Sequence, residues 1–226
     1  MTTTTRRTGR RADGLSKDRI VEAAIDILDT GGENALTFRS LAARLTTGSG
    51  AIYHHVANKD ELLAAATDAI IARVVTEMAE ADTPRQTIRT LALGVFDAID
   101  AHPWAGAQLS REPWQSGMLR ILEGMGAQLQ ALGVPEHAQF DCATALVNCV
   151  LGLAGQYAAG ARLVPPDTDR AAFLATVAAE WTRLDADQYP FVHRIAAQLR
   201  DHDDREQFLA GIDLILGGID TLNRKP

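Results

Sequence analysis

The sequence predicts an all-α protein of ten or eleven helices arranged in two parts. Apolar residues recur at helical spacing, and from Pro84 onward no segment alternates between apolar and polar residues as a strand does. Proline and glycine interrupt the pattern at points that suit helix ends. After the first four helices, the predicted helices cover residues 84–101, 103–110, 114–132, 136–160, 168–184, 190–201 and 204–222.

The first helix and a long helix further on both carry boundary signals. Ser16 is a typical helix-capping residue, and the apolar pattern that follows it ends at the pair Gly31–Gly32. Asn58 and Glu61 stand three residues apart and predict a capping box for a long helix that continues to Met78. The apolar positions of the first helix are Ile20, Ala23, Ala24, Ile27 and Leu28.

Between these helices, residues 37–56 predict two short helices joined by a tight turn. Thr37 can cap the first of them. The second begins at Ser49, and Ile52 and Val56 face inward because they are four residues apart. This arrangement is a helix-turn-helix, in which the second helix enters the major groove of DNA. The apolar face of the first helix consists of Phe38, Leu41, Ala42 and Leu45.

The same residues resemble a known family. The run LTFRSLAARL, followed by AIYHHVANKDELL, is similar to the DNA-binding domain of the TetR family of transcriptional regulators over about residues 16–65. The resemblance implies a DNA-binding domain at residues 16–62. It also implies a larger helical bundle for ligand binding and dimerisation at residues 63–226. The closing stretch, FVHRIAAQL through FLAGIDLILGGI, is similar to the C-terminal end of the tetracycline-repressor subgroup.

The resemblance assigns DNA contacts to the turn, the second helix and their flanks. In the family's pattern Tyr53 directs its hydroxyl to a phosphate, although its ring can also pack in the small domain's core. Lys59 stands at a helix start that can hold a phosphate, although a lone lysine there is usually plain surface. Thr46 occupies a turn position often held by glycine. The second helix starts with small side chains, so specificity is expected to depend on Arg39, His54 and DNA shape. The predicted DNA-binding residues are Thr37, Arg39, Thr47, Gly48, Ser49, Gly50, Ala51, Tyr53, His54, His55 and Lys59.

Charge is divided unevenly along the chain. The net charge is −7, but the residues up to Glu61 carry nine Lys and Arg against eight Asp and Glu, and the remainder carries thirteen against twenty-one. The acidic remainder repels DNA, so only one face of the protein is expected to approach it. Residues 1–15 form a basic arm, predicted to be disordered, that can lie along phosphates or enter a minor groove. A solvated tail without DNA contacts is the alternative.

Two apolar stripes in the second domain predict that its helices need partners. The resemblance implies a homodimer, which places two reading helices on a palindromic operator about 34–36 Å apart. A monomer that buries both stripes internally is the alternative. One stripe, on the 136–160 helix, is Cys142, Leu146, Cys149 and Leu153, and the other, on the last helix, is Phe208, Ile212, Ile215, Ile219 and Leu222.

The two cysteines, Cys142 and Cys149, are expected to be buried small apolar groups. Seven residues on one helix separate them by about 10.5 Å along the axis, which is too far for a bond between them. Redox sensing through a bond between subunits is the alternative, and it requires an activated thiolate.

A mixture of aromatic, apolar and polar residues predicts a mostly apolar ligand cavity. The stripe from Trp114 to Leu129 has the spacing of ordinary core, and core is the alternative for most of these residues. The resemblance implies that some of them line a cavity, and Trp104, Gln108 and Asn148 are the preferred ones. Gln108 stands where tetracycline-binding relatives carry a metal-liganding histidine, which disfavours a magnesium–tetracycline ligand. The predicted ligand-binding residues are Phe96, His102, Trp104, Gln108, Trp114, Met118, Leu122, Asn148 and Trp181, with Leu109, Met125 and Tyr157 as further candidates.

Motifs for catalysis, metal binding and membrane insertion are missing from the sequence. There is no GxSxG, no phosphate-binding GxxxxGK[ST] loop and no HExxH. His54 and His55 are adjacent, so on a helix they point about 100° apart and cannot easily share one metal ion. The longest apolar run, Ala143 to Gly155, is shorter than the ~20 residues of a membrane helix, and no signal peptide is recognised. We therefore expect a cytoplasmic, non-enzymatic protein without metal or cofactor.

These observations predict a ligand-responsive, DNA-binding transcriptional regulator. The specific prediction is a repressor that a small, largely apolar molecule releases from its operator. The alternative is an activator, or a helical ligand-binding or interaction module without repressor function.

Overall fold

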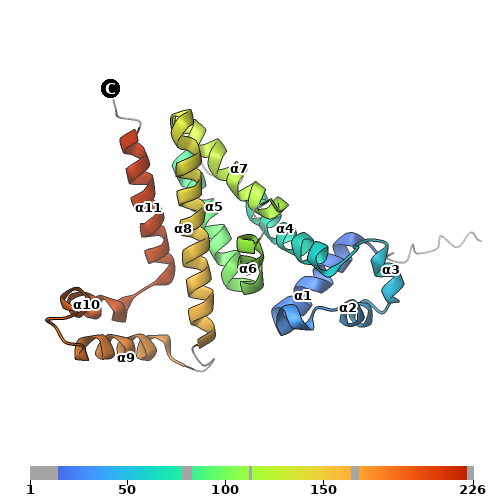
Figure 1. Ribbon diagram of the computed structural model, residues 1–226, viewed down its shortest axis with the longest axis horizontal. Helices are drawn as coiled ribbons and strands as arrows, with labels where there is room; N and C mark the ends of the chain where they lie inside the picture. Colours follow the sequence, from blue (N-terminus) through green and yellow to red (C-terminus); the bar gives the residue numbers. More distant parts are fainter. Residues whose placement is uncertain (1–14, 78–82, 112–113, 164–167, 223–226) are drawn as a thin grey trace, which may run out of the picture. The chain divides into compact units, whose positions relative to one another are not determined.

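The computed structural model describes residues 15–77, 83–111, 114–163 and 168–222, which form α-helices and one 3-10 helix and no strand (Figure 1). The predicted all-α fold class is confirmed. The chain divides into two compact units, Met1–Ala66 and Thr67–Pro226. Apart from Leu15, the predicted basic arm lies outside the described residues.

The first unit begins with a helix that ends later than predicted. The Ser16 hydroxyl accepts a hydrogen bond from the Arg19 N–H at 3.3 Å and so caps the helix as expected. Gly32 has a φ of 67° and breaks the regular helix at the predicted place, yet helical structure resumes as far as Ala35. The helices of this unit are α1 (Lys17–Ala35), α2 (Phe38–Arg44), α3 (Ser49–Tyr53) and the beginning of α4 (Lys59–Glu77).

The start of α4 is fixed by a variant of the predicted capping box. Asn58 Oδ1 accepts from the Glu61 N–H at 2.8 Å, as predicted. The return bond differs, because Glu61 Oε2 accepts from the N–H of Ala57, at 2.9 Å, one residue before the cap. This hydrogen bond, and then the Lys17 ammonium at 3.4 Å, lowers the pKa of Glu61. A lowered carboxyl pKa stabilises the fold above the ordinary pKa of glutamate, and that contribution is lost as the pH falls through the folded value.

The turn between α2 and α3 contains a residue in the left-handed region. Thr46 has a φ of 53° and is the one non-glycine residue with a positive φ among those described. A β-branched side chain is strained in this conformation. The turn is held by hydrogen bonds from the Thr46 N–H to the Ala43 oxygen at 3.3 Å and from the Thr47 N–H to the Ala42 oxygen at 3.0 Å. The geometry explains why the family's pattern often has glycine at this position.

The second unit is a helical bundle with α5 at its centre. α5 contacts α6, α7, α8 and α11, and Phe96, Leu146 and Phe208 belong to the shared apolar core. The helix bounds agree closely with the ranges predicted from sequence. The remaining elements are α5 (Pro84–Ala101), α6 (Pro103–Arg111), α7 (Ser116–Ala131), α8 (Glu136–Leu163), α9 (Arg170–Arg183), α10 (Pro190–Ile195), the 3-10 helix η1 (Ala196–Asp201) and α11 (Asp204–Leu222).

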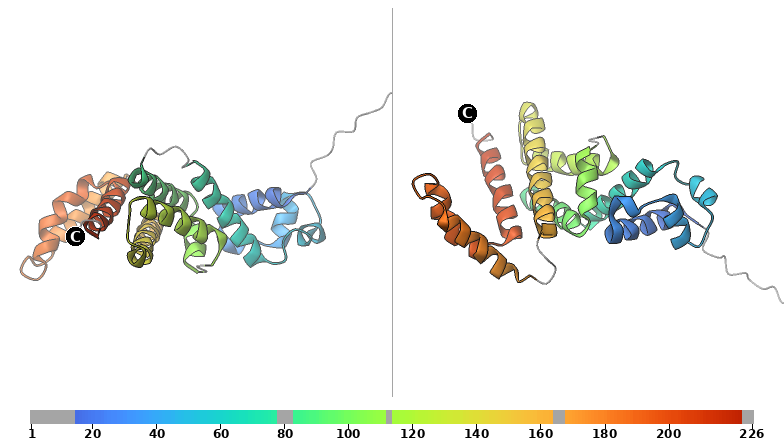
Figure 2. Two further views of the ribbon diagram at one scale, coloured as in Figure 1. Left: turned by 90° about the horizontal axis from the view of Figure 1, so that it is seen from above. Right: turned by 60° about the horizontal axis from the view of Figure 1, so that its bottom comes forward.

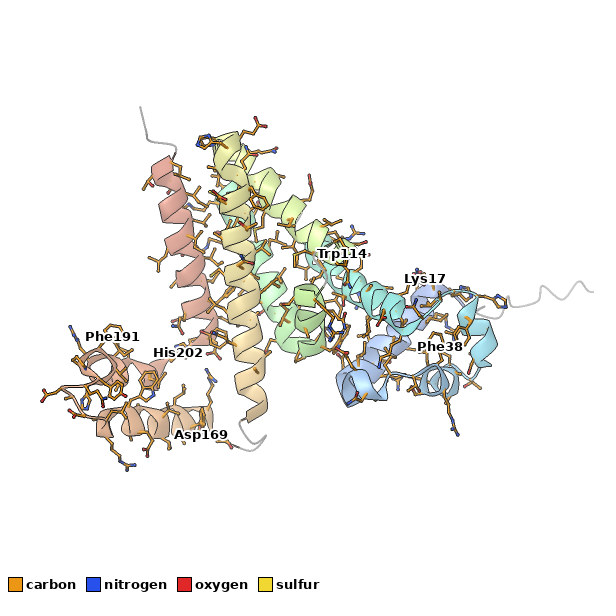
Figure 3. All side chains as sticks on the ribbon, in the orientation of Figure 1. Lys17, Phe38, Trp114, Asp169, Phe191 and His202 are labelled. Atoms are coloured by element: carbon orange, nitrogen blue, oxygen red, sulfur yellow. The ribbon has the colours of Figure 1, made fainter. Side chains whose placement is uncertain are left out.

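Two segments of the second unit differ from the prediction. The predicted helix at 190–201 is a short α-helix followed by a 3-10 helix. α9, α10 and η1 contact one another, and Figure 2 shows α9 and α10 lying beside each other. The predicted helix at 114–132 begins only at Ser116, so Trp114 precedes it and is 71% exposed (Figure 3). Trp114 therefore does not extend the apolar stripe of α7.

The two stripes predicted to need a partner pack against each other inside one chain. Leu146 of α8 and Phe208 and Ile212 of α11 have no exposed surface, and they lie in the same core cluster. The prediction that these stripes face a second copy is therefore wrong for their buried members, because the surface of those residues is already used within one chain. Burial raises the pKa of both Cys142 and Cys149. A raised thiol pKa opposes thiolate formation and favours the interpretation of both cysteines as apolar filling.

α8 is long and apolar enough over Glu136–Gly160 to cross a membrane, judged by length and composition alone. Such a helix also occurs at the centre of a soluble bundle. Leu146, Val150 and Ala154 are buried against neighbouring helices of this unit. Within the described residues, 33% of the apolar window is buried, and a single helix of this kind is weak evidence for a membrane span.

The strained turn yields a stability prediction. Replacing Thr46 with glycine removes the left-handed strain, and this gain exceeds the entropy that glycine adds to the unfolded chain, so we expect about 0.5–1 kcal/mol of stabilisation. Thr47→Gly is the matched control, since Thr47 has no positive φ, and it should destabilise by up to about 1 kcal/mol. Urea denaturation of both variants measures the difference. Equal effects of the two changes would contradict the assignment of strain to Thr46.

Candidate functional site

α3 turns most of its surface outward. Ile52 is its one fully buried residue, and Val56, four positions later, is buried as well. These two side chains anchor the segment, as their spacing predicted. The rest of the helix is exposed or half-buried, so α3 is available to another molecule along most of its length.

Tyr53 lies on the surface and not in the core. Its ring stacks on Phe38 with ring centroids 4.2 Å apart and an interplanar angle of 3°, while 55% of the residue remains exposed. Phe38 belongs to α2, at the place marked in Figure 3. The stack fixes the ring by contacts between apolar faces and leaves the hydroxyl outside the core. A rigid, outward hydroxyl suits a phosphate contact.

The surface around α2 and α3 carries no carboxylate of its own. From Leu36 to Asn58 the sequence contains two arginines and no Asp or Glu. Arg44 is held by Asp26 at 2.5 Å. Arg39 is exposed and has no ion-pair partner among the described residues. Its guanidinium is therefore available to a phosphate or a base edge.

Two predicted DNA-binding residues also have roles within the fold. Thr37 forms a full capping box with Ser40, in which each backbone N–H donates to the other side chain at 3.0 Å. The Lys59 ammonium donates to the carbonyl oxygen of Glu33. An ammonium has three hydrogens, so this bond positions Lys59 while two hydrogens remain for a phosphate. Local sequence pattern does not predict the Glu33 contact, because it joins residues 26 positions apart in the chain.

The turn and the start of α3 are built from small residues. Gly48 is the N-cap of α3, and a Cβ added to Gly48 or Gly50 would meet nothing within 4 Å. The protein's own packing therefore does not require glycine at these positions. Of the other predicted residues, His54 is exposed, and Thr47, Ser49, Ala51 and His55 are half-buried.

The second unit contains a cavity of about 420 Å³ between α6, α7 and α8. It brings together Met118, Leu122 and Asn148, three of the predicted ligand-binding residues. Its volume lies within the range of small-molecule sites. The complete lining is Leu109, Ser110, Met118, Leu122, Thr144, Val147, Asn148, Leu151 and Gly152.

The structure does not bring all the predicted ligand residues to one place. Trp104 and Gln108, two of the three preferred residues, are buried and line none of the cavities described here. Phe96 lines a cavity of about 530 Å³ together with Tyr157, and His102 lines one of about 330 Å³ beside α4. Trp114 is exposed, as described above, and Trp181 is half-buried on α9.

Sequence reasoning missed part of the cavity wall. Thr144, Val147 and Leu151 share a face of α8 with Asn148, at the spacing that a helix requires. Choosing Asn148 and then taking its neighbours three and four residues away would have found Thr144 and Leu151, whereas Val147 directly precedes Asn148. Ser110, by contrast, comes from α6, and only the packing of α6 on α8 reveals it.

No group of three or more His, Cys, Asp or Glu side chains within the described ranges is arranged to hold a metal ion. The residues of the 420 Å³ cavity include no such ligand either. The wall of this cavity offers apolar surface and the hydrogen-bonding groups of Ser110, Thr144 and Asn148.

Comparison with known proteins places the first unit in a bacterial family. Residues 20–66 match the family described as bacterial regulatory proteins, tetR family. The HTH-type transcriptional repressor DrrR1 of Streptomyces coeruleorubidus is 44% identical over 61 residues, which is 25% of this chain and 23% of that protein.

Two further relatives extend the likeness into the second unit. An HTH-type transcriptional regulator of Saccharopolyspora erythraea is 32% identical over 139 residues, covering 61% of this chain and 59% of that protein. The match thus spans less than two thirds of either curated relative. The solved structure of the transcriptional regulator SCO7222, a TetR from Streptomyces coelicolor, has a TM-score of 0.85 and 52% identity, covering 93% of this chain and 100% of that chain. Because this likeness extends over the whole of SCO7222, the chain belongs to the TetR family, as its helix-turn-helix residues predicted.

Proposed function

We propose that this TetR-family regulator is a homodimeric, cytoplasmic repressor that a small, largely apolar molecule releases from a palindromic operator. The observation that carries the proposal is the surface of α2 and α3. It presents the outward face of α3, the ring-stacked Tyr53 and the exposed Arg39, without any Asp or Glu from Leu36 to Asn58. The major groove accepts one α-helix, so α3 can read bases while its flanks hold phosphates. The name of DrrR1 supports repression as the direction of control.

The DNA interface is tested with variants that leave the fold intact. Tyr53→Phe keeps the stack on Phe38 and removes only the hydroxyl, so we expect operator affinity to fall about three- to tenfold with an unchanged melting temperature. Arg39→Gln should also reduce the slope of log affinity against log salt by about 0.9, the value for one phosphate contact. Fluorescence anisotropy with DNA from upstream of the gene measures both quantities.

Arg183→Gln is the matched control, because Arg183 is an exposed arginine of the second unit that pairs with Glu180. It removes the same charge and should leave affinity and salt slope as they are. If Arg39→Gln and Arg183→Gln behaved alike, Arg39 would not be a DNA contact. If the parent protein bound no upstream DNA, the repressor proposal would fail.

We place the dimer contact on the outer faces of α8 and α11. The buried stripes of these helices are used within one chain, but each helix also exposes a second stripe of small residues. Gly152, Gly155, Gly217 and Gly218 would all accept a Cβ without any contact within 4 Å. Glycine inside a helix costs about 0.5–1 kcal/mol relative to alanine, and the close approach of a partner helix explains its use here. The exposed stripes are Ala145, Gly152, Gly155 and Ala159 on α8 and Ala210, Leu214, Gly217 and Gly218 on α11.

Leu214 provides the test of this contact. It is 79% exposed on α11, and Leu214→Glu would place a charge in the proposed interface, where its desolvation opposes pairing. We expect sedimentation analysis to show monomers and operator affinity to fall at least about a hundredfold, because both half-sites are needed. Leu119→Glu changes another exposed leucine, on α7, outside the stripes, and should leave a dimer. A dimeric Leu214→Glu protein would place the contact elsewhere.

The same helices suggest how an effector in the cavity reaches the DNA-binding unit. α7 supplies Met118 and Leu122 to the cavity wall. The side chain of Arg120 on the same helix binds Asp68 of α4, with Nε and Oδ1 2.8 Å apart. α4 continues without a break from Thr67 back to Lys59. A ligand that displaces α7 therefore changes the force on α4. To release the operator, the ligand needs only to bind the DNA-free arrangement of the protein more tightly than the DNA-bound one.

Arg120→Gln separates binding from transmission. The pair is partly exposed, so its loss should change stability by no more than about 1 kcal/mol. We expect operator affinity and effector affinity to stay within about twofold of the parent, while the effector releases DNA less completely. Arg89→Gln, which removes the ion pair between α5 and Asp213 of α11, serves as the control and should keep full release. Unchanged release by the Arg120 variant would exclude this route.

A further inference from the structure

The cavity between α6, α7 and α8 differs from its neighbours in having no ionisable side chain in its wall. Its nine lining residues include no Asp, Glu, Lys, Arg, His, Tyr or Cys. The cavity of about 530 Å³ is lined by charged residues such as Arg170 and Asp204, and the one of about 330 Å³ by Arg73 and Asp97. Ser110, Asn148 and Gly152 are exposed and form the open side of the cavity, whereas Leu109, Met118 and Val147 are buried. A charged ligand group that reached the buried side would leave water without meeting an opposite charge, which is strongly unfavourable.

The hydroxyl groups of Ser110 and Thr144 in the cavity wall already donate their hydrogens to backbone carbonyl oxygens. Ser110 Oγ donates to the Gly106 carbonyl at 3.0 Å, and Thr144 Oγ1 donates to the Phe140 carbonyl at 2.8 Å. A hydroxyl has one hydrogen and two lone pairs. Toward the cavity, therefore, both groups can only accept a hydrogen bond.

Asn148 completes the polar part of the wall. Its carboxamide has no hydrogen-bond partner among the residues that the structure describes, and it offers both donors and an acceptor. Three of the wall's polar groups can thus accept a hydrogen bond, and one of them can also donate. This pattern selects a ligand that carries an O–H or N–H donor.

We infer that the effector is an uncharged molecule with an apolar body and at least one hydroxyl or amine hydrogen, and that carboxylates, sulfonates and organic ammonium ions are rejected. The inference rests on the proposed function, because it names the ligand class of the proposed effector site. The net negative charge of the second unit also disfavours anionic ligands, since the residues after Glu61 carry thirteen Lys and Arg against twenty-one Asp and Glu.

Four probes on one ring system test the inference in the full chain. They are 1-hydroxypyrene, 1-methoxypyrene, pyrene-1-carboxylate and pyrenemethylammonium, titrated near neutral pH with fluorescence as the readout. We expect 1-hydroxypyrene to bind best and 1-methoxypyrene to bind about two- to tenfold more weakly, because it lacks the hydrogen. The two charged probes should bind at least about a hundredfold more weakly.

Variants with matched controls locate the binding. Ser110→Trp places an indole at the cavity wall and should abolish 1-hydroxypyrene binding, whereas Ala107→Trp, at another exposed position of α6, should not. Thr144→Val removes an acceptor without changing the side chain's shape and should bring the hydroxy and methoxy probes to similar affinity. Thr176→Val is its control, because Thr176 makes the same bond to its own helix, at 2.9 Å, outside the cavity.

The outcomes separate this inference from the proposed function. If pyrene-1-carboxylate or pyrenemethylammonium bound within tenfold of 1-hydroxypyrene and was sensitive to Ser110→Trp, the selection against charge would be overturned. Probe binding that ignored Ser110→Trp, or no binding at all, would overturn the inference as well. Operator binding is measured separately in the same samples. If 1-hydroxypyrene filled the cavity and never released DNA, the effector role of the site would fail while its chemical selectivity stood.

Discussion

The unbroken hydrogen-bonded backbone of α4 is the constraint on which the proposed regulation depends. The division between the two units falls between Ala66 and Thr67, inside a helix that runs from Lys59 to Glu77. A helix resists bending, because each turn is closed by backbone hydrogen bonds. Its first part is fixed in the DNA-binding unit by the Asn58 cap and the Lys59 contact, and its second part is fixed by Asp68 and the buried Ile71. The two units therefore share one structural element.

The two candidate sites use opposite chemistry. The α2–α3 surface is polar and exposed, and its aromatic stack and caps hold it in shape without covering it. The cavity in the second unit is apolar and carries only three hydrogen-bonding side chains. A surface of the first kind attracts a charged polymer over a distance, whereas a cavity of the second kind binds by removing apolar surface from water. Two sites of such different chemistry do not compete for the same ligand.

Helix existence and type were predictable because they depend on local pattern. The spacing of Ile20, Ala23, Ala24, Ile27 and Leu28 and the caps at Ser16, Thr37 and Asn58 act within one or two turns. The helix-turn-helix was predictable for the same reason, whereas the left-handed backbone of Thr46 became known only from the structure. The apolar stripes of α8 and α11 were predicted correctly, but the surface that covers them was not. Periodicity shows that a helix face is buried without showing what covers it.

The sequence by itself therefore determined the all-α class, the helix-turn-helix and its outward residues, and the family to which the chain belongs. Tertiary structure decided what lies far apart in the chain. It joined Ser110 of α6 to Asn148 of α8, and it put the Lys59 ammonium on the Glu33 carbonyl. It also buried Trp104 and Gln108 and left Trp114 exposed. The physical reason is that helical pattern and capping depend on neighbours three or four residues away, whereas a cavity depends on which helices pack together and on the shape of the side chains between them.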